Sequence, residues 1–277
     1  MIKYLFIVFC FFNVAAFAQE IKLRKRNFNA PLGSQFAKSI ADTNLSIQVR
    51  EQLIYSEIRN GNIPSFLRKL NPIQVVKVIN GKGYKLIYYT ISDYLSIGEN
   101  ADFFYLSTTP MLAQKIADLT NSILPTKKMV DDIYANAAIK LEPQPIPPSK
   151  AMTTVPIFVA YNDVVIKQLE SFKLIHEQSG LTAGNKKDIV ISNKIFDQPT
   201  PRVVIYGWHK LNGQAIQPVY NKHTSNWADY SHGVRLISNV GYLNGKRTKL
   251  TTILKDPKLH VLLSDEGQIL NSKYPLD

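Results

Sequence analysis

Apolar residues recur at helical spacing in several stretches of the chain. From residue 34 to residue 70 they return every three or four positions, which predicts a helical region interrupted near its end by a glycine and a proline. Thr109 and Thr126 each precede an apolar stripe and are suitable N-cap residues, so a helix is predicted after each. A further helix is predicted over residues 158–172.

Other stretches have the composition and turn residues of β-strands. The runs 73–79 and 84–91 flank Asn80-Gly81, which predicts a hairpin. A second Asn-Gly pair, at 244–245, predicts another hairpin between 234–243 and 246–250. Further predicted elements are strands at 188–192 and 203–208 and a closing helical segment at 251–263.

The order of these elements predicts an α+β fold. A helical N-terminal part with a hairpin is followed by a mixed, mostly antiparallel β part with flanking helices. The proline-rich run 142–150 cannot form a helix or a central strand, because proline lacks the N–H group and fixes φ. The expected organisation is therefore an N-terminal region at 19–141, a linker at 142–150 and a β-rich C-terminal domain at 151–277.

Residues 1–18 have the pattern of a secretory signal peptide. Lys3 precedes a short apolar run that ends in Ala16-Phe17-Ala18, and the run is shorter than the ~20 residues of a transmembrane helix. The sequence therefore predicts a secreted or periplasmic protein with no membrane span after cleavage.

Composition narrows the chemistry of the mature chain. Of the 277 residues, the first 18 contain the single cysteine, Cys10, and one lysine. Their removal leaves 259 residues and lowers the formal charge from +12 to +11. A mature chain without cysteine has no thiolate nucleophile, disulfide or cysteine-ligated zinc, and no nucleotide-binding glycine motif is present. No cofactor is predicted. The expected partner of so basic an extracellular chain is an anionic polysaccharide or peptidoglycan; no nucleic-acid-binding motif occurs.

Residues 206–235 concentrate the chemically versatile side chains. This segment holds both tryptophans and three of the five histidines of the chain, in a stretch with little periodicity. The candidate catalytic residues are His209, Asp229, Tyr230, Ser231 and His232. The candidate substrate-binding residues are Trp208, His223, Trp227, Arg235 and, outside the segment, Lys187.

Several chemistries remain open for this segment. Asp229 could orient the His232 imidazole for acid–base catalysis, with Ser231 as a nucleophile if another histidine reached its hydroxyl. Tyr230 or His232 as base, with Arg235 neutralising a carboxylate, would suit β-elimination on a uronic-acid polymer. A divalent metal site from His209, His223 and His232 is a third alternative, although their spacing matches no compact metal motif.

The run Ser231-His232-Gly233-Val234-Arg235-Leu236 resembles the Ser-His-Gly-Cys-Val-Arg motif of L,D-transpeptidases. That family consists of secreted cysteine enzymes that cross-link peptidoglycan, and it has a histidine upstream of the motif, as His209 and His223 are here. The catalytic cysteine of the family has no counterpart between Gly233 and Val234. The resemblance therefore implies an envelope glycan as partner without implying the cysteine mechanism.

Two functions are predicted from these features. The first is a secreted hydrolase or lyase that acts on an anionic cell-envelope or extracellular polymer by histidine-based acid–base chemistry. The alternative is a non-catalytic envelope or polysaccharide-binding protein, in which Trp208, Trp227 and nearby tyrosines stack on sugars beside basic residues.

Overall fold

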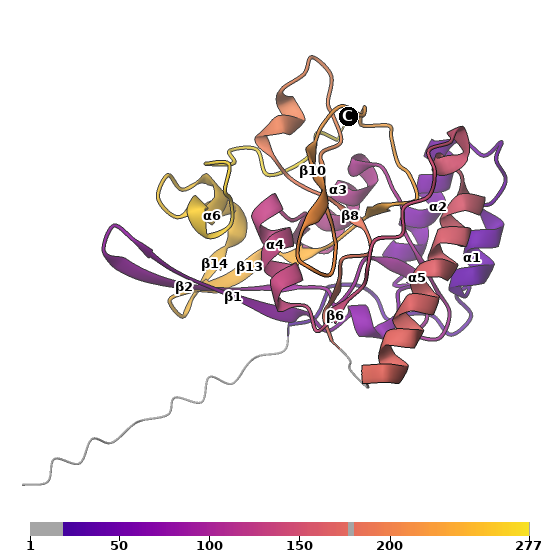
Figure 1. Cartoon of the computed structure of the whole chain (residues 1–277), viewed down its shortest axis with the longest axis horizontal. Coiled ribbons are helices and arrows are strands. Elements are labelled where there is room, and N and C mark those ends of the chain that lie inside the picture. Colours follow the sequence, from indigo (N-terminus) through magenta and orange to yellow (C-terminus); the bar gives the residue numbers. More distant parts are fainter. Residues whose placement is uncertain (1–18, 177–179, 277) are drawn as a thin grey trace, which may run out of the picture.

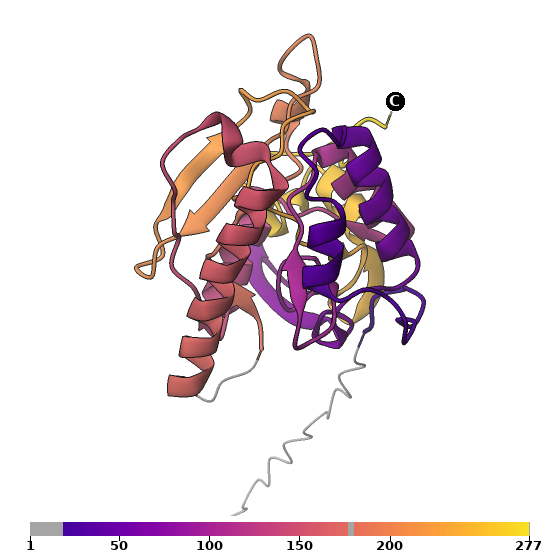
Figure 2. The ribbon, with the colours of Figure 1, turned by 90° about the vertical axis from the view of Figure 1, so that its right-hand side faces the viewer.

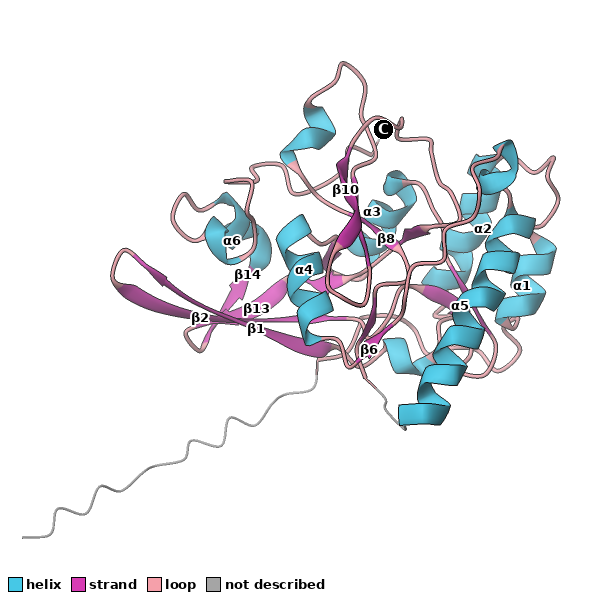
Figure 3. Cartoon of the chain, in the orientation of Figure 1, coloured by secondary structure: helices cyan, strands magenta, loops and turns pink. Residues whose placement is uncertain are grey.

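The structure, a computed structural model, describes residues 19–176 and 180–276. Helices and mostly antiparallel sheets alternate in mixed order, so the predicted α+β class is confirmed (Figures 1 and 3). Helices α1, α2 and α5 gather on one side of the molecule, as both views show (Figure 2). The predicted signal peptide, residues 1–18 with Cys10, lies outside the described residues.

The helix starts follow the capping residues seen in the sequence. Thr109 and Thr126 accept hydrogen bonds from the backbone N–H of Leu112 and Met129, and these contacts fix where α3 and α4 begin. The helices are α1 (Gly33–Ser39), α2 (Ile47–Arg59), α3 (Pro110–Leu119), α4 (Lys127–Asn136), α5 (Val155–His176) and α6 (Leu250–Lys255). Short 3₁₀ turns are η1 (Ser65–Leu67), η2 (Lys150–Thr153), η3 (Asn193–Phe196) and η4 (His260–Leu262).

The larger sheet has six strands, all of whose pairings are antiparallel. Its members are β1 (Asn71–Ile79), β2 (Lys82–Thr90), β5 (Ser122–Ile123), β12 (Ile237–Ser238), β13 (Val240–Leu243) and β14 (Lys246–Lys249). Both predicted hairpins are present. Their Asn-Gly turns have positive φ at both residues, 49° and 74° at 80–81 and 48° and 80° at 244–245, as this turn type requires.

A four-stranded sheet includes three stretches of the histidine- and tryptophan-rich segment, residues 206–209, 215–220 and 232–233. It runs in the order β10-β9-β8-β11 and consists of β8 (Lys187–Ile189), β9 (Ile205–His209), β10 (Ala215–Tyr220) and β11 (His232–Gly233). Two small sheets pair β3 (Ser96–Gly98) with β4 (Phe103–Tyr105) and β6 (Ile139–Lys140) with β7 (Thr182–Ala183).

Some element predictions are wrong in extent. The single strand predicted over 234–243 is two short strands, β12 and β13, because residues 234–236 carry the chain from β11 of the four-stranded sheet to the six-stranded sheet. Its apolar run reflects burial between sheets, with Val234 fully buried. The helical region 34–70 is divided into α1, α2 and η1, and the closing helix into α6 and η4.

The two predicted regions do not have separate cores. The six-stranded sheet joins β1, β2 and β5 to β12, β13 and β14, which come from opposite sides of the 142–150 segment. Residues 141–149 contain neither helix nor strand, as the prolines require, but the segment crosses one continuous core rather than linking two. Across the described ranges, none of the helices has the length and hydrophobicity needed to cross a membrane.

Candidate functional site

Strand β11 places the Ser231–Gly233 turn beside β8. The two strands are parallel, with His232 opposite Lys187 and Gly233 opposite Asp188, and the Lys187 N–H donates to the Ser231 carbonyl at 2.7 Å. A Cβ atom at Gly233 would lie 2.5 Å from the Tyr94 ring. Glycine is therefore required where the strand packs this closely.

Four residues form what we call the Asp229 cluster: Trp227, Asp229, Ser231 and His232. The Ser231 N–H and hydroxyl both donate to Asp229 Oδ1, at 2.8 and 2.5 Å, and Trp227 Nε1 donates to Oδ2 at 3.3 Å. Burial opposes ionisation of Asp229, but His232, Lys187 and the Ser231 hydrogen bonds together lower its pKa to about 2. The cluster therefore holds a permanent buried carboxylate.

His232 is the most unusual member of the cluster. Its side chain is fully buried, and neither ring nitrogen has a hydrogen-bond partner. Nε2 lies 3.7 Å from Asp229 Oδ2, beyond hydrogen-bond distance. Burial lowers the pKa of His232 to about 4, so the imidazole is neutral at pH 7.

Ser231 and Tyr230 make contacts that fit a structural role. The Ser231 hydroxyl donates to Asp229 rather than to an imidazole, so the cluster lacks the serine–histidine contact of an activated nucleophile. The Tyr230 hydroxyl accepts from the Ile146 N–H at 2.9 Å, and its carbonyl accepts from Lys186 Nζ at 2.6 Å. Burial raises the pKa of Tyr230, which disfavours a phenolate base.

Three predicted binding residues lie around this cluster. His223 stacks on Trp227 with ring centroids 4.6 Å apart and planes at 9°, and both rings are partly exposed. Lys187 Nζ lies 4.7 Å from the Trp208 ring centroid. Trp208 is only 5% exposed, and its Nε1 donates to the Tyr161 hydroxyl, so its ring is not free to stack on a sugar.

His209 belongs to a different group, centred on Asp131 of α4. Asp131 Oδ1 lies 3.1 Å from His209 Nε2 and accepts from the Tyr206 hydroxyl at 2.7 Å, while Oδ2 pairs with Lys127 at 2.9 Å. The His209 ring stacks on Tyr134 at 4.5 Å. Against the effect of burial, these hydrogen bonds, that of His209 foremost, lower the pKa of Asp131 to about 2.

Asp131 was not among the residues predicted from the sequence. It lies one helical turn after Lys127, a spacing typical of a surface ion pair, and nothing local shows that β9 packs across it.

Arg235 is enclosed in a third group. Its guanidinium lies over the Tyr94 ring at 4.1 Å, donates to the Thr182 carbonyl at 2.9 Å, and is 3.9 Å from Asp188 Oδ1. Burial raises the pKa of Asp188 to about 6. Because Arg235 is buried and bonded within the protein, it is not presented to a substrate in this structure.

The three candidate metal ligands have different partners. His209 contacts Asp131, His223 stacks on Trp227, and His232 faces Asp229. Within residues 19–176 and 180–276, no group of three or more histidine, cysteine or acidic side chains could hold a metal ion.

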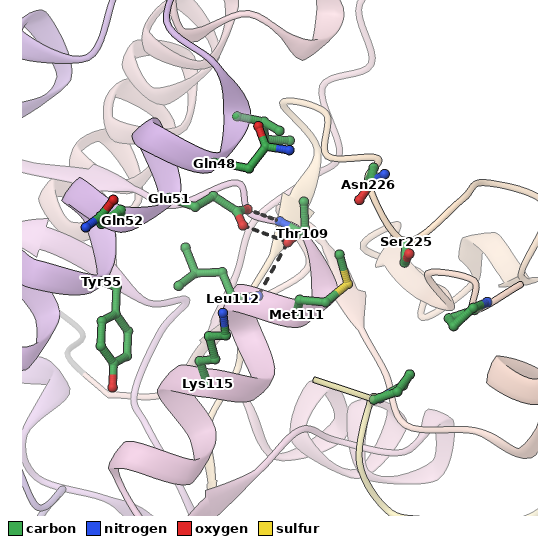
Figure 4. A pocket seen from close by; sticks show the side chains of 13 residues that line it. Gln48, Glu51, Gln52, Tyr55, Thr109, Met111, Leu112, Lys115, Ser225 and Asn226 are labelled. Carbon is green, nitrogen blue, oxygen red and sulfur yellow. Dashed lines mark hydrogen bonds between the residues drawn. The ribbon is translucent and has the colours of Figure 1, made fainter. Parts of the chain in front are cut away.

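An open groove, which we call the α2 groove, runs past the Asp229 cluster. It consists of two adjoining cavities, of about 810 and 280 Å³, that share Ile47 and Asn226. In the larger cavity, side chains of α2 and α3 face Ser225 and Asn226 on the opposite loop (Figure 4). Trp227 lines the smaller cavity, so the outer edge of the Asp229 cluster forms part of the wall.

Polar side chains line the larger cavity. Gln48, Gln52, Tyr55 and Lys115 surround Glu51 (Figure 4). The Glu51 carboxylate accepts from the Thr109 N–H at 2.6 Å and from its hydroxyl at 2.8 Å, and burial raises its pKa. Glu51 therefore holds the start of α3 in place.

Arg50 lines the smaller cavity, and its guanidinium donates from Nη1 to the Thr153 carbonyl at 3.4 Å. Its side chain packs over the Phe158 ring at 5.5 Å and is only 8% exposed, and its Nε–H has no partner. Of the α2 groove residues, Trp227 was predicted from the sequence as a binding residue. The polar side chains of α2 were not predicted, because this helix was recognised only from its apolar, core-facing positions.

Comparisons with protein-family models, with curated proteins and with solved structures gave no match. The resemblance of residues 231–236 to the L,D-transpeptidase motif remains a prediction on those residues alone.

Proposed function

We propose that the protein binds an extended glycan of the cell envelope or extracellular matrix in the α2 groove. The observation that carries this proposal is the lining of the groove, where a partly exposed tryptophan, amide side chains and a buried guanidinium with an unpartnered Nε–H border two adjoining cavities. Aromatic faces pack on sugar rings, and amides and guanidinium groups bond hydroxyls and carboxylates.

The proposed ligand is an acidic polysaccharide or peptidoglycan. Arg50 and Lys115 supply positive charge along the groove, and the mature chain predicted from the sequence carries a net charge of +11. Asp42 in the smaller cavity and Glu51 in the larger one would oppose a carboxylate, which favours placement of the acidic groups beside Arg50 and Lys115. Secretion or a periplasmic location, as predicted from residues 1–18, belongs to the same proposal.

The binding function is preferred to the enzymatic one for a geometric reason. A general base must come within hydrogen-bond distance of the proton that it removes. His232 and His209 are both buried, and neither lines the α2 groove. Trp227 and Arg50 do line it.

A hydrolase or lyase is the second candidate function. The observation in its favour is the His232 imidazole, whose two ring nitrogens are unpartnered beside a carboxylate that is bonded to a residue of the groove wall. Movement of the Trp227 loop would be needed to bring a substrate to this imidazole.

Retention on immobilised polymer tests the binding proposal. Peptidoglycan sacculi and a linear polyuronate should retain the chain from residue 19 onward, and Trp227→Ala should weaken retention at least several-fold. Phe28→Ala is the matched control, because Phe28 is 94% exposed and lies outside the groove. Equal retention of wild type and Trp227→Ala would refute the groove as the binding site.

Mass spectrometry of the supernatants separates the two functions. Binding alone predicts no soluble fragments from either polymer. Release of fragments that is lost in His232→Gln would favour the hydrolase or lyase and overturn the preferred proposal.

A further inference from the structure

The six-stranded sheet has one buried face and one outer face. The buried face includes Ile73, Leu86 and Tyr88, each no more than 1% exposed. Successive residues of a strand point to opposite sides, and directly paired residues of antiparallel strands point to the same side. The strand register therefore defines which side chains form the outer face.

The outer face extends across both hairpins. Val76 of β1 pairs with Lys85 of β2, and Ile87 of β2 pairs with Tyr242 of β13. Tyr242 in turn pairs with Arg247 of β14, and two residues along, Val240 pairs with Lys249. Val78 lies on the same side as Val76. Gln74 and Tyr89 also lie on this side, but Tyr89 is buried beside Tyr242. The set here named the outer face is Val76, Val78, Lys85, Ile87, Val240, Tyr242, Arg247 and Lys249.

Apolar side chains on this face are open to solvent. Val76 and Val78 are 66% and 70% exposed, near the end of a hairpin that extends from the body of the molecule (Figure 1). Ile87 and Tyr242 are partly exposed further along the sheet. Exposed valines on a projecting strand expose apolar area that a binding partner would cover.

The two hairpins are also entirely basic. Residues 71–90 and 240–249 contain no aspartate or glutamate. Their cations are Lys77, Lys82, Lys85, Lys246, Arg247 and Lys249. Direct pairing of β2 with β13 brings the two sets together, so the charge is concentrated on one part of the surface.

We propose that the outer face docks on an anionic lipid bilayer. A membrane surface offers both kinds of interaction that this face requires, since lipid phosphates attract the cations and the interfacial region accepts exposed apolar side chains. A soluble polyanion would satisfy Lys85, Arg247 and Lys249 but leave the valines in water. A second copy of the chain would bring like charges together.

Vesicle flotation tests this proposal with the chain from residue 19 onward. Vesicles of phosphatidylcholine with roughly 30% phosphatidylglycerol should carry the protein, whereas vesicles of phosphatidylcholine alone should carry at least ten-fold less. Binding should fall as salt rises, because exposed charges are screened.

Two variants and one matched control locate the surface. Lys85→Glu/Arg247→Glu/Lys249→Glu should abolish flotation, and Val76→Thr/Val78→Thr should reduce it several-fold while keeping β-branched residues in the strand. Lys167→Glu/Lys210→Glu/Lys222→Glu changes the net charge equally at exposed positions elsewhere and should retain binding.

Each other outcome contradicts the proposal. Equal flotation with both vesicle types, or equal loss in the control triple variant, would show that the outer face is not the docking surface. A soluble polyuronate that displaces wild type from the vesicles but does not displace Val76→Thr/Val78→Thr would identify a polysaccharide as the occupant. A concentration-dependent dimer that Val76→Thr/Val78→Thr dissolves would identify a second copy. These readouts involve no residue of the α2 groove, so this proposal can fail or succeed independently of the proposed function.

Discussion

His232 Nε2 lies 3.7 Å from Asp229 Oδ2, in a site where the imidazole has no hydrogen-bond partner and the carboxylate has three donors. At pH 7, where the imidazole carries no charge, Lys187 and the hydrogen bonds from Ser231 keep the carboxylate ionised. His232 stays neutral because burial penalises its cationic form more than Asp229 favours it.

This relationship predicts a pH dependence of stability that His232→Gln removes. The pKa of His232 is about 4 in the folded state and 6.5 when exposed, so between these values the unfolded chain binds more protons. The free energy of unfolding contributed by His232 therefore falls as pH drops from 6.5 to 4, by about 3 kcal/mol. Chemical denaturation at several pH values should show that the difference in free energy of unfolding between wild type and His232→Gln shrinks by this amount as the pH drops.

Asp188 supplies a comparison of opposite sign. Its pKa is raised from 3.8 to about 6, so in that range the folded chain binds more protons and its contribution to stability falls as pH rises. Asp188→Asn should therefore show a steeper rise in stability with pH than wild type, and His232→Gln a shallower one. Parallel pH profiles for all three proteins would contradict both assignments.

Lys186 predicts a second dependence, in the alkaline range. Burial lowers its pKa from 10.5 to about 7, with Nζ bonded to the Tyr230 carbonyl and 5.0 Å from the Tyr161 ring centroid. Between these pKa values the unfolded chain holds more protons, so the stability of wild type relative to Lys186→Met should rise by about 2 kcal/mol from roughly pH 7 to pH 9. Lys167→Met, at an exposed position of α5, is the control. Its free energy of unfolding relative to wild type should be the same at both ends of this pH range.

Gly233→Ala tests the close packing of β11. The added Cβ would meet Tyr94 at 2.5 Å and the Lys186 side chain at 2.8 Å, so β11 would have to move away from β8. We expect a loss of about 1–3 kcal/mol in the free energy of unfolding, measured by urea denaturation. Gly83→Ala is the control, since nothing lies within 4 Å of a Cβ there. A tolerated Gly233→Ala would show that the two strands are less tightly packed than described.

Asp131 and Asp265 form a matched pair, because each accepts from Lys127. Asp131 also bonds His209 and Tyr206, whereas the side-chain hydrogen bond described for Asp265 is with Lys127. In thermal denaturation, Asp131→Ala should lower the free energy of unfolding by about 1–3 kcal/mol, and Asp265→Ala should lower it by less than about 1 kcal/mol. Similar losses in the two variants would mean that the lysine pairing, not the His209 group, is the stabilising contact.

The parts of the fold that depend on local chemistry were predictable. The Asn80-Gly81 and Asn244-Gly245 turns adopt positive φ, and Thr109 and Thr126 cap the helices that follow them. These features need only the residues of the turn or the first helical turn. The order of strands in the two sheets depends on partners that are distant in the sequence. Beyond the two hairpins, no turn or capping residue indicates which strands will pair.

The candidate site was predicted less well, for the same reason. Trp208 and His209 are adjacent, yet one packs against Lys187 and the other against Asp131, because consecutive strand residues point to opposite faces. The concentration of histidines and tryptophans in residues 206–235 therefore indicated a single site, whereas the structure divides these side chains among several separate groups. The α2 groove lies between a helix and a loop that are far apart in the chain, so its lining could not be read from either segment.

The parallel pairing of β11 with β8 also has a consequence for folding. It closes a long loop, since the pairing joins Lys187 to His232, and the packing of Gly233 on Tyr94 adds a still more distant segment. Such contacts gain energy only after the entropy of loop closure has been lost, which makes them slow to form. The Asp229 cluster should therefore be completed late, and its buried carboxylate and imidazole would stay hydrated until the chain is nearly native.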